Sequence, residues 1–163
     1  MYQIDLNSDL GESFGHYTIG NDDKIIPLIT SANVACGYHA SDPVVMMETI
    51  QRVKEAGIAV GAHPGLPDLM GFGRRSMAIS NEEAKAYTLY QISAIGGMCK
   101  AVGVKLQHVK PHGALYNMAA KDYDLSKAIC EAIYEYDKDL IVMGLSGSEM
   151  IKAAKDCGLK SAS

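Results

Sequence analysis

Histidines follow three separate strand-like segments of this chain. His39 comes shortly after Leu28–Cys36, His63 ends Ile58–His63, and His112 follows Lys105–Lys110. Imidazole can serve as an acid, a base or a neutral metal ligand. A single histidine is more often a packing or surface residue. The repetition at successive strand ends is what favours a functional site.

Acidic residues accompany the first strand-like segment. Asp5, Asn7 and Asp9 occupy alternate positions and therefore lie on one face of a strand, and Glu12 follows in the next loop. Either Asp9 or Glu12 can supply a general base. The alternative is an edge strand whose polar face is solvated.

Cationic residues lie close to the same strand ends. Lys110 shares a strand face with His108 and His112, so its ammonium can reach an oxyanion or a phosphate, although a solvated lysine is the alternative. Arg74 and Arg75 come next to a flexible Gly-Phe-Gly turn and are suited to clamping a carboxylate or phosphate.

The motifs leave the cofactor open. The pattern H-E-x-x-H is absent, so a metal site would have to be assembled from separate strands, with Asp9, His39 and His63 as candidate ligands. Neither the P-loop pattern nor G-x-G-x-x-G occurs. If ATP is used, we therefore expect a partner to bind it.

Length and composition predict one domain, residues 1–163, with 48% hydrophobic content and one core. A net charge of −4 argues against nucleic acid as a partner. No secretory signal and no apolar run of about 18 residues is visible, so we expect no membrane association. The four scattered cysteines fit reduced thiols in a cytoplasmic protein.

Strand-like and helical segments alternate, which predicts βα units and a parallel sheet, with the strand carboxyl ends gathered on one rim. The expected strands are Tyr2–Asp9, Leu28–Cys36, Ile58–His63, Lys105–Lys110, Leu140–Leu145 and a last fragment from Leu159. Such units form either an open doubly wound sheet or most of a barrel. An exposed last edge indicates truncation or association, including a homo-oligomer.

Four helices have start or stop signals. One follows Asp42-Pro43 and ends near Gly57, and another has a capping box at Ser80 and Glu83 and ends at Gly103. Asp124 is expected to cap a third helix, and a fourth is expected to start at Gly147 or Ser148 and to end at Gly158. The pair Gly96-Gly97 is expected to weaken the second helix.

Four ordered segments resemble motifs of the LamB/YcsF family. They are Asp5–Gly15 (DLNSDLGESFG), Ser31–Pro43 (SANVACGYHASDP), Gly61–Pro64 (GAHP) with Gly71–Arg75 (GFGRR), and Val109–Asn117 (VKPHGALYN). The resemblance spans the whole chain. It implies an α/β fold, a distorted (β/α) barrel of the glycoside hydrolase/deacetylase type. Because the family runs to about 250 residues, as a nearly complete barrel does, we expect the C-terminal part of the barrel to be missing here.

The resemblance also implies a role in the ATP-dependent opening of 5-oxoproline to glutamate, together with partner B and C subunits. In that reaction Asp9 or Glu12 would activate water, while Lys110 and His112 would stabilise the oxyanion or protonate nitrogen. The remaining rim residues would bind the substrate: Asn7, Asn33, His39, Arg74 and Arg75. Two alternatives stay open, a metal-dependent deacetylase acting on N-acetylated sugars and a non-catalytic binding subunit.

Overall fold

The computed structural model describes residues 4–163, which form one six-stranded parallel sheet. Residues 2 and 3 of the first expected strand lie outside the described part. All six expected strands are present, each shorter than its sequence pattern. They are β1 (Asn7–Leu10), β2 (Ser31–Ala35), β3 (Ala59–His63), β4 (Leu106–Val109), β5 (Ile141–Met143) and β6 (Lys160–Ala162).

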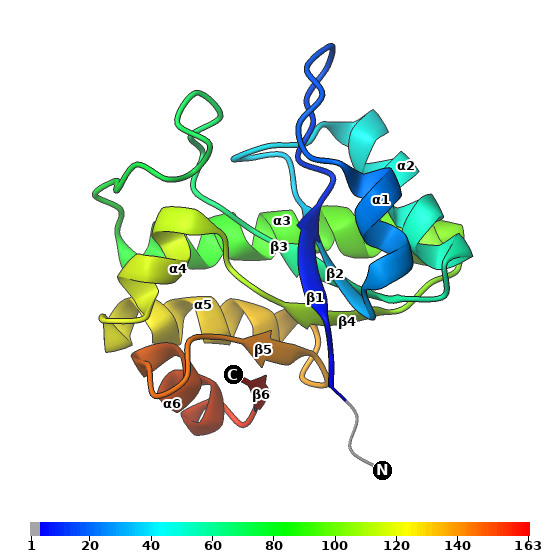
Figure 1. The fold of residues 1–163 in the computed structure, drawn as a ribbon. Helices are drawn as coiled ribbons and strands as arrows, with labels where there is room; N and C mark the ends of the chain where they lie inside the picture. The colour runs from blue at the N-terminus through cyan, green and yellow to red at the C-terminus, as the bar shows by residue number, and fades with distance from the viewer. Residues whose placement is uncertain (1–3) are drawn as a thin grey trace.

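The strand order decides between the two expected architectures. The strands lie side by side in sequence order from β1 to β6, whereas a doubly wound sheet reverses its order at a switch point. Right-handed parallel connections in a constant direction keep the crossover helices on one face of the sheet. Figure 1 shows this arrangement as an α/β barrel wall. Among residues 4–163, no backbone pairing joins β6 to β1.

The helices confirm most of the predicted signals. The Asp42 side chain caps α2 (Pro43–Glu55), and the complete capping box of Ser80 and Glu83 begins α3 (Asn81–Val102). Gly103 ends α3 in the left-handed conformation, with φ 80°. Helix α6 (Glu149–Asp156) follows Ser148 as expected. Within the described part of the chain, no helix combines the length and apolar character needed to cross a membrane.

The helix assignments differ from the sequence analysis in four elements. Helix α5 (Tyr123–Tyr136) is capped by Asp122 and not by Asp124, because the Asp122 carboxylate accepts from the backbone N–H of Leu125. Two short helices, α1 (Asp22–Ile25) and α4 (Gly113–Ala119), and a 3-10 turn at Ile26–Leu28 carried too little apolar periodicity to be predicted.

The Gly96-Gly97 pair does not interrupt α3. At Gly96, α3 packs closely on α5, since a Cβ there would lie 1.8 Å from the hydroxyl oxygen of Tyr136. Gly97 faces open space. The glycine that lowers helix propensity is thus needed for helix packing, and tertiary contacts outweigh that propensity.

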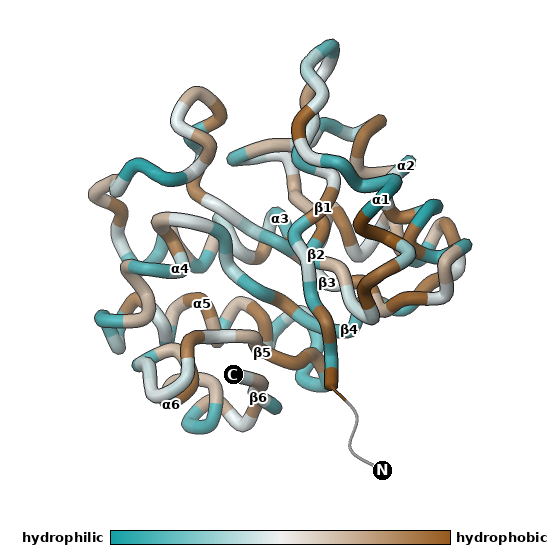
Figure 2. Tube along the Cα trace, viewed as in Figure 1, coloured by the Kyte–Doolittle hydropathy of each residue, from teal (hydrophilic) through white to brown (hydrophobic). Residues whose placement is uncertain are grey.

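The core lies between the sheet and its helices. Val34, Val60, Val109 and Val142, one from each of four neighbouring strands, are fully buried, as are Ile92 and Ile95 of α3. By contrast, β1 is mostly hydrophilic in Figure 2. Its polar residues face a second, polar layer on the opposite side of the sheet, and this layer leads to the candidate site.

Candidate active site

Loops at the carboxyl ends of the first four strands bring the candidate residues together. Asp9 lies in β1 and His63 ends β3, while Lys110 and His112 follow β4, with His112 at the N-cap of α4. Figure 1 shows the loops after β1 and β3 projecting from this rim. The rim placement expected for a parallel βα fold is therefore present.

Asp9 occupies the junction between the rim groups. Its Oδ1 accepts from Lys110 Nζ at 2.8 Å and from Asn33 Nδ2 at 2.8 Å, and its Oδ2 lies 3.3 Å from His63 Nε2. Burial raises the pKa of this carboxyl, but the hydrogen bonds and charges of His63 and Lys110 outweigh burial and hold the pKa well below its usual range. Asp9 is therefore ionised at neutral pH.

A buried network of side-chain amide groups positions Asp9. Asn33 is fully buried, and its Nδ2 donates to Asp9 and, at 2.5 Å, to Asn7 Oδ1. Its Oδ1 accepts from Asn7 Nδ2 at 3.1 Å and from His108 Nε2 at 2.7 Å. Because Asn33 is bonded through both ends of its amide, its side chain cannot rotate without breaking several bonds. Asn33 therefore orients the Asp9 carboxylate, and Asn7 in turn holds the Asn33 amide in place.

Gly61 makes room for this network. It pairs with Asn33 on β2 and with His108 on β4, and a Cβ at this position would lie 2.0 Å from His108 Nε2. Since His108 is only 1% exposed, its ring cannot move aside easily. The glycine is therefore required by packing against an imidazole.

Replacing Gly61 with alanine should lower the free energy of unfolding by about 1–3 kcal/mol, the usual cost of overpacking a filled interior. Urea denaturation monitored by circular dichroism measures this change. Gly97→Ala is the matched control, because its Cβ meets nothing within 4 Å and alanine favours a helix. Equal stability of the two variants would contradict the packing role of Gly61.

Three imidazoles and one carboxylate form a compact group next to Asp9. His39 Nε2 lies 3.0 Å from Glu12 Oε1, and His112 Nδ1 lies 3.6 Å from the same oxygen. His63 Nε2 and His112 Nδ1 are 2.9 Å apart, and the rings of His39 and His112 stack with centroids 3.6 Å apart. One ligand atom from each of Glu12, His39, His63 and His112 lies within 4.8 Å of the others, so this group can hold a metal ion.

This group differs in composition from the metal ligands considered above, which were Asp9, His39 and His63. His39 and His63 belong to it, whereas the Oδ1 of Asp9 is held by Lys110 and Asn33. Burial lowers the pKa values of His39 and His112 in this group, and that of the nearby His108. For His108 and His112 the pKa falls to about 4. For His112, the neighbouring His39 and His63 add to this effect.

The two arginines lie in different surroundings. Arg75 Nε donates to both carboxylate oxygens of Asp68, at 3.0 and 3.1 Å, and Asp68 is only 5% exposed. This pair fixes the loop after β3. Arg74 makes no ion pair with any residue of 4–163, and its guanidinium lies 5.8 Å from the centre of the Phe72 ring. Of the two guanidinium groups, only that of Arg74 is not held by a carboxylate of the described residues.

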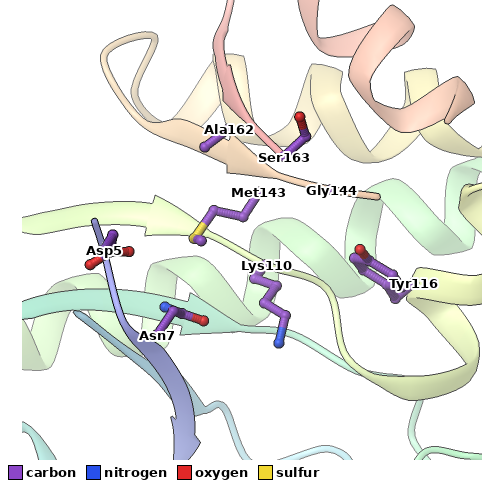
Figure 3. Close-up of a pocket in the computed structure, with 8 residues that line it drawn as sticks. All are labelled: Asp5, Asn7, Lys110, Tyr116, Met143, Gly144, Ala162 and Ser163. Carbon is purple, nitrogen blue, oxygen red and sulfur yellow. The ribbon is translucent and has the colours of Figure 1, made fainter. Parts of the chain in front are cut away.

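Two cavities flank the cluster. One, of about 410 Å³, is shown in Figure 3 and is lined by Asp5, Asn7, Lys110, Tyr116, Met143, Gly144, Ala162 and Ser163. The other, of about 300 Å³, is more apolar and is lined by Glu12 and His39 together with Phe14, Tyr17, Ile19, Ala40, Leu69 and Phe72. Both are large enough for a small-molecule ligand, and Lys110 connects the first cavity to Asp9.

The sequence pattern did not assign a role to His108, Tyr116 or Asp68, and it assigned Arg75 to the substrate, whereas the structure pairs Arg75 with Asp68. A signal existed for His108, since it alternates with Lys110 and His112, but its inward direction depends on Gly61 in the neighbouring strand. Tyr116 lies on α4, which was not predicted, and nothing in the sequence marked it as a cavity residue.

The fold and the site together define the class of this protein. It is an α/β barrel wall that carries acidic, imidazole and amine groups at the carboxyl ends of its strands. The chain belongs to the LamB/YcsF family, whose model matches residues 4–163. It is 61% identical over 160 residues to the A subunit of 5-oxoprolinase from Clostridium beijerinckii, covering 98% of this chain and 63% of that protein. It is 59% identical over 162 residues to the corresponding protein of Bacillus subtilis, covering 99% and 63%.

A solved structure agrees with this assignment. The crystal structure of the lactam utilization protein from Thermus thermophilus matches with a TM-score of 0.97 at 46% identity, over 99% of this chain and 65% of that one. The chain thus spans 63% of the length of each of the two named relatives. The family expected from the four motifs is confirmed.

Proposed function

We propose that this chain acts as the A component of an ATP-dependent 5-oxoprolinase, opening the lactam of 5-oxoproline to L-glutamate with B and C subunits. The observation that carries the proposal is the identity of about 60% to proteins named as the A subunit of 5-oxoprolinase. The site supports it, because it combines ionised, imidazole and amine groups beside a cavity. ATP would be bound by the partner subunits, in the cytoplasm.

The chemistry explains why ATP is needed. A five-membered lactam resists water because its carbonyl is resonance-stabilised and its nitrogen leaves poorly. Transfer of the γ-phosphoryl group to the amide oxygen activates the carbon, and a water molecule then adds to it. The C–N bond breaks as nitrogen takes up a proton, and a second water hydrolyses the resulting acyl phosphate to glutamate and phosphate.

Asp9 is the proposed acceptor of the proton from the attacking water. It is ionised, and its side chain is one-third exposed, so water can reach it. Its lowered pKa makes it a weak base, so the proposal requires that ATP first activates the carbon that water attacks. Glu12 is more enclosed and is bonded to His39, which favours a structural or ligand role for it.

Lys110 is the proposed donor to the developing negative charge. Its ammonium is beside Asp9 and also lines the larger cavity. His112 was expected to share this role, but its Nε2–H donates to the carbonyl of Phe72 at 2.8 Å and is not directed at the cavity. Arg74 is proposed to bind the substrate carboxylate.

Reconstitution tests this proposal. The chain is combined with B and C subunits, ATP and 5-oxoproline, and glutamate and ADP are measured, with the C. beijerinckii relative in place of this chain as the positive control. Glutamate formation that requires this chain supports the proposal. Binding of 5-oxoproline without turnover, when the positive control turns over, would overturn it in favour of a purely ligand-binding role. Acetate release from an N-acetylated sugar would instead favour the deacetylase.

A further inference from the structure

Backbone carbonyls determine which nitrogen carries the proton in two of the clustered imidazoles. His63 Nδ1 lies 2.6 Å from the carbonyl oxygen of Lys110, and His112 Nε2 lies 2.8 Å from that of Phe72. A carbonyl oxygen can only accept, so each of these nitrogens carries a hydrogen. In the neutral rings, His63 Nε2 and His112 Nδ1 therefore present lone pairs.

These two lone pairs point at each other. His63 Nε2 and His112 Nδ1 are 2.9 Å apart, and both residues are almost completely buried, at 1% and 2% exposure. Two acceptors at this distance repel unless a cation lies between or beside them. Water cannot screen the repulsion in a buried site. The arrangement is stable only with a bound proton or a bound metal ion.

The charge balance requires at least one further positive charge. With neutral imidazoles, the carboxylates of Asp9 and Glu12 face a single ammonium, that of Lys110. One negative charge in a largely buried cluster remains uncompensated, which is unfavourable. A proton shared by His63 and His112 would supply this charge, and a divalent ion would supply it while also binding both facing lone pairs and the Glu12 carboxylate.

We propose that Glu12, His39, His63 and His112 bind one divalent transition-metal ion. The ligands of a tetrahedral zinc ion with bonds of about 2.1 Å lie about 3.4 Å apart. The observed separations of 2.9, 3.0 and 3.6 Å, with a largest value of 4.8 Å, bracket that spacing. Three imidazoles and one carboxylate select Zn²⁺ or a similar ion over Mg²⁺ or Ca²⁺, which prefer oxygen ligands.

The surroundings of the ligands agree with a metal site. Metal-binding histidines usually donate their second N–H to a carbonyl or carboxylate, as His63 and His112 do. The carbonyl that receives His112 belongs to Phe72, whose φ of 54° lies in the left-handed region that costs a non-glycine residue about 1 kcal/mol. His39 differs, because its Nδ1 is buried without a hydrogen-bond partner among the described residues. Asp9 Oδ2, 3.3 Å from His63 Nε2, lies beside the proposed ion.

Metal content and metal binding test the inference directly, without substrate or partner subunits. Protein purified without chelators should contain about one equivalent of metal by elemental analysis, and chelator-treated protein should rebind Zn²⁺ but not Mg²⁺ in calorimetric titrations. Co²⁺ should give visible d–d absorption of a site with nitrogen ligands. His63→Gln and His112→Gln should each weaken Zn²⁺ binding at least about tenfold.

His108→Gln is the matched control, since His108 is equally buried on the same sheet but lies outside the ligand group. It should bind Zn²⁺ as the unmodified chain does. Circular dichroism checks that each variant is folded, and the Co²⁺ spectrum of the unmodified chain gives a result even where a variant unfolds. Absence of metal together with absence of Zn²⁺ and Co²⁺ binding would overturn the inference and leave a shared proton between His63 and His112. Because no activity is measured, this outcome is independent of the proposed lactam hydrolysis.

Discussion

Replacing Asp9 with asparagine is expected to lower the turnover of 5-oxoproline by the reconstituted complex by roughly 10²-fold or more, the scale for losing a general base. Asparagine keeps the shape of the side chain but cannot accept a proton. It also leaves the Lys110 ammonium without its partner at 2.8 Å. Glutamate formation measured at saturating ATP and 5-oxoproline gives the change in turnover.

Asp23→Asn is the control for this variant, because Asp23 forms an exposed ion pair with Arg52, and neither residue belongs to the candidate site. Such pairs contribute at most about 1 kcal/mol, so turnover should stay near that of the unmodified chain. Thermal unfolding of Asp9→Asn should show a folded protein. If Asp9→Asn were folded and retained near-normal turnover, Asp9 could not be the proton acceptor.

The second large effect concerns acid stability and depends on His108. Burial, opposed by the charge of Asp5 and aided by those of His63 and Lys110, lowers the pKa of His108 to about 4 in the folded protein, against 6.5 for the free side chain. Between these values the unfolded chain binds more protons than the folded one. The free energy of unfolding should therefore fall as the pH decreases from about 6.5 to about 4. The contribution of His108 to this fall is at most about 3 kcal/mol.

His108→Gln should flatten this dependence. A glutamine amide can donate to Asn33 Oδ1 in place of His108 Nε2, but it does not titrate. Urea denaturation at several pH values should show a smaller loss of stability on acidification, with a remainder from His39 and His112, whose pKa values are lowered by burial in the same direction. The variant His16→Ala, at an exposed position, controls for the removal of a histidine. An equally steep profile in His108→Gln would show that His108 does not contribute.

Most of the fold was predictable because local signals and tertiary structure agree. The capping box at Ser80 and Glu83 and the terminal glycine Gly103 define α3 from the sequence alone. The strand ends at His63 and near Lys110 followed from their apolar runs and from the glycine and proline next to them. The short α4 was missed because one or two turns of helix carry little periodicity, and its position depends on packing against α5.

The choice of barrel wall over doubly wound sheet could not be made from the residues alone, because both architectures alternate strands and helices. The resemblance to the family motifs favoured the barrel. The site was predictable only as a set of residues on one rim. Which atoms meet depends on side-chain rotamers and on contacts between distant segments, such as Gly61 with His108 and Asp68 with Arg75. The facing nitrogens of His63 and His112 have no sequence signature.

A crystal structure of the chain with 5-oxoproline bound, in the presence of B and C subunits, is the most direct test of the central claim that one rim site carries the reaction. The account predicts that the lactam carbonyl lies within hydrogen-bond distance, about 3 Å, of the Lys110 ammonium, with a water molecule between its carbon and the Asp9 carboxylate. A lactam bound only in a partner subunit, with no contact to Asp9, Lys110 or the histidine cluster, would contradict it.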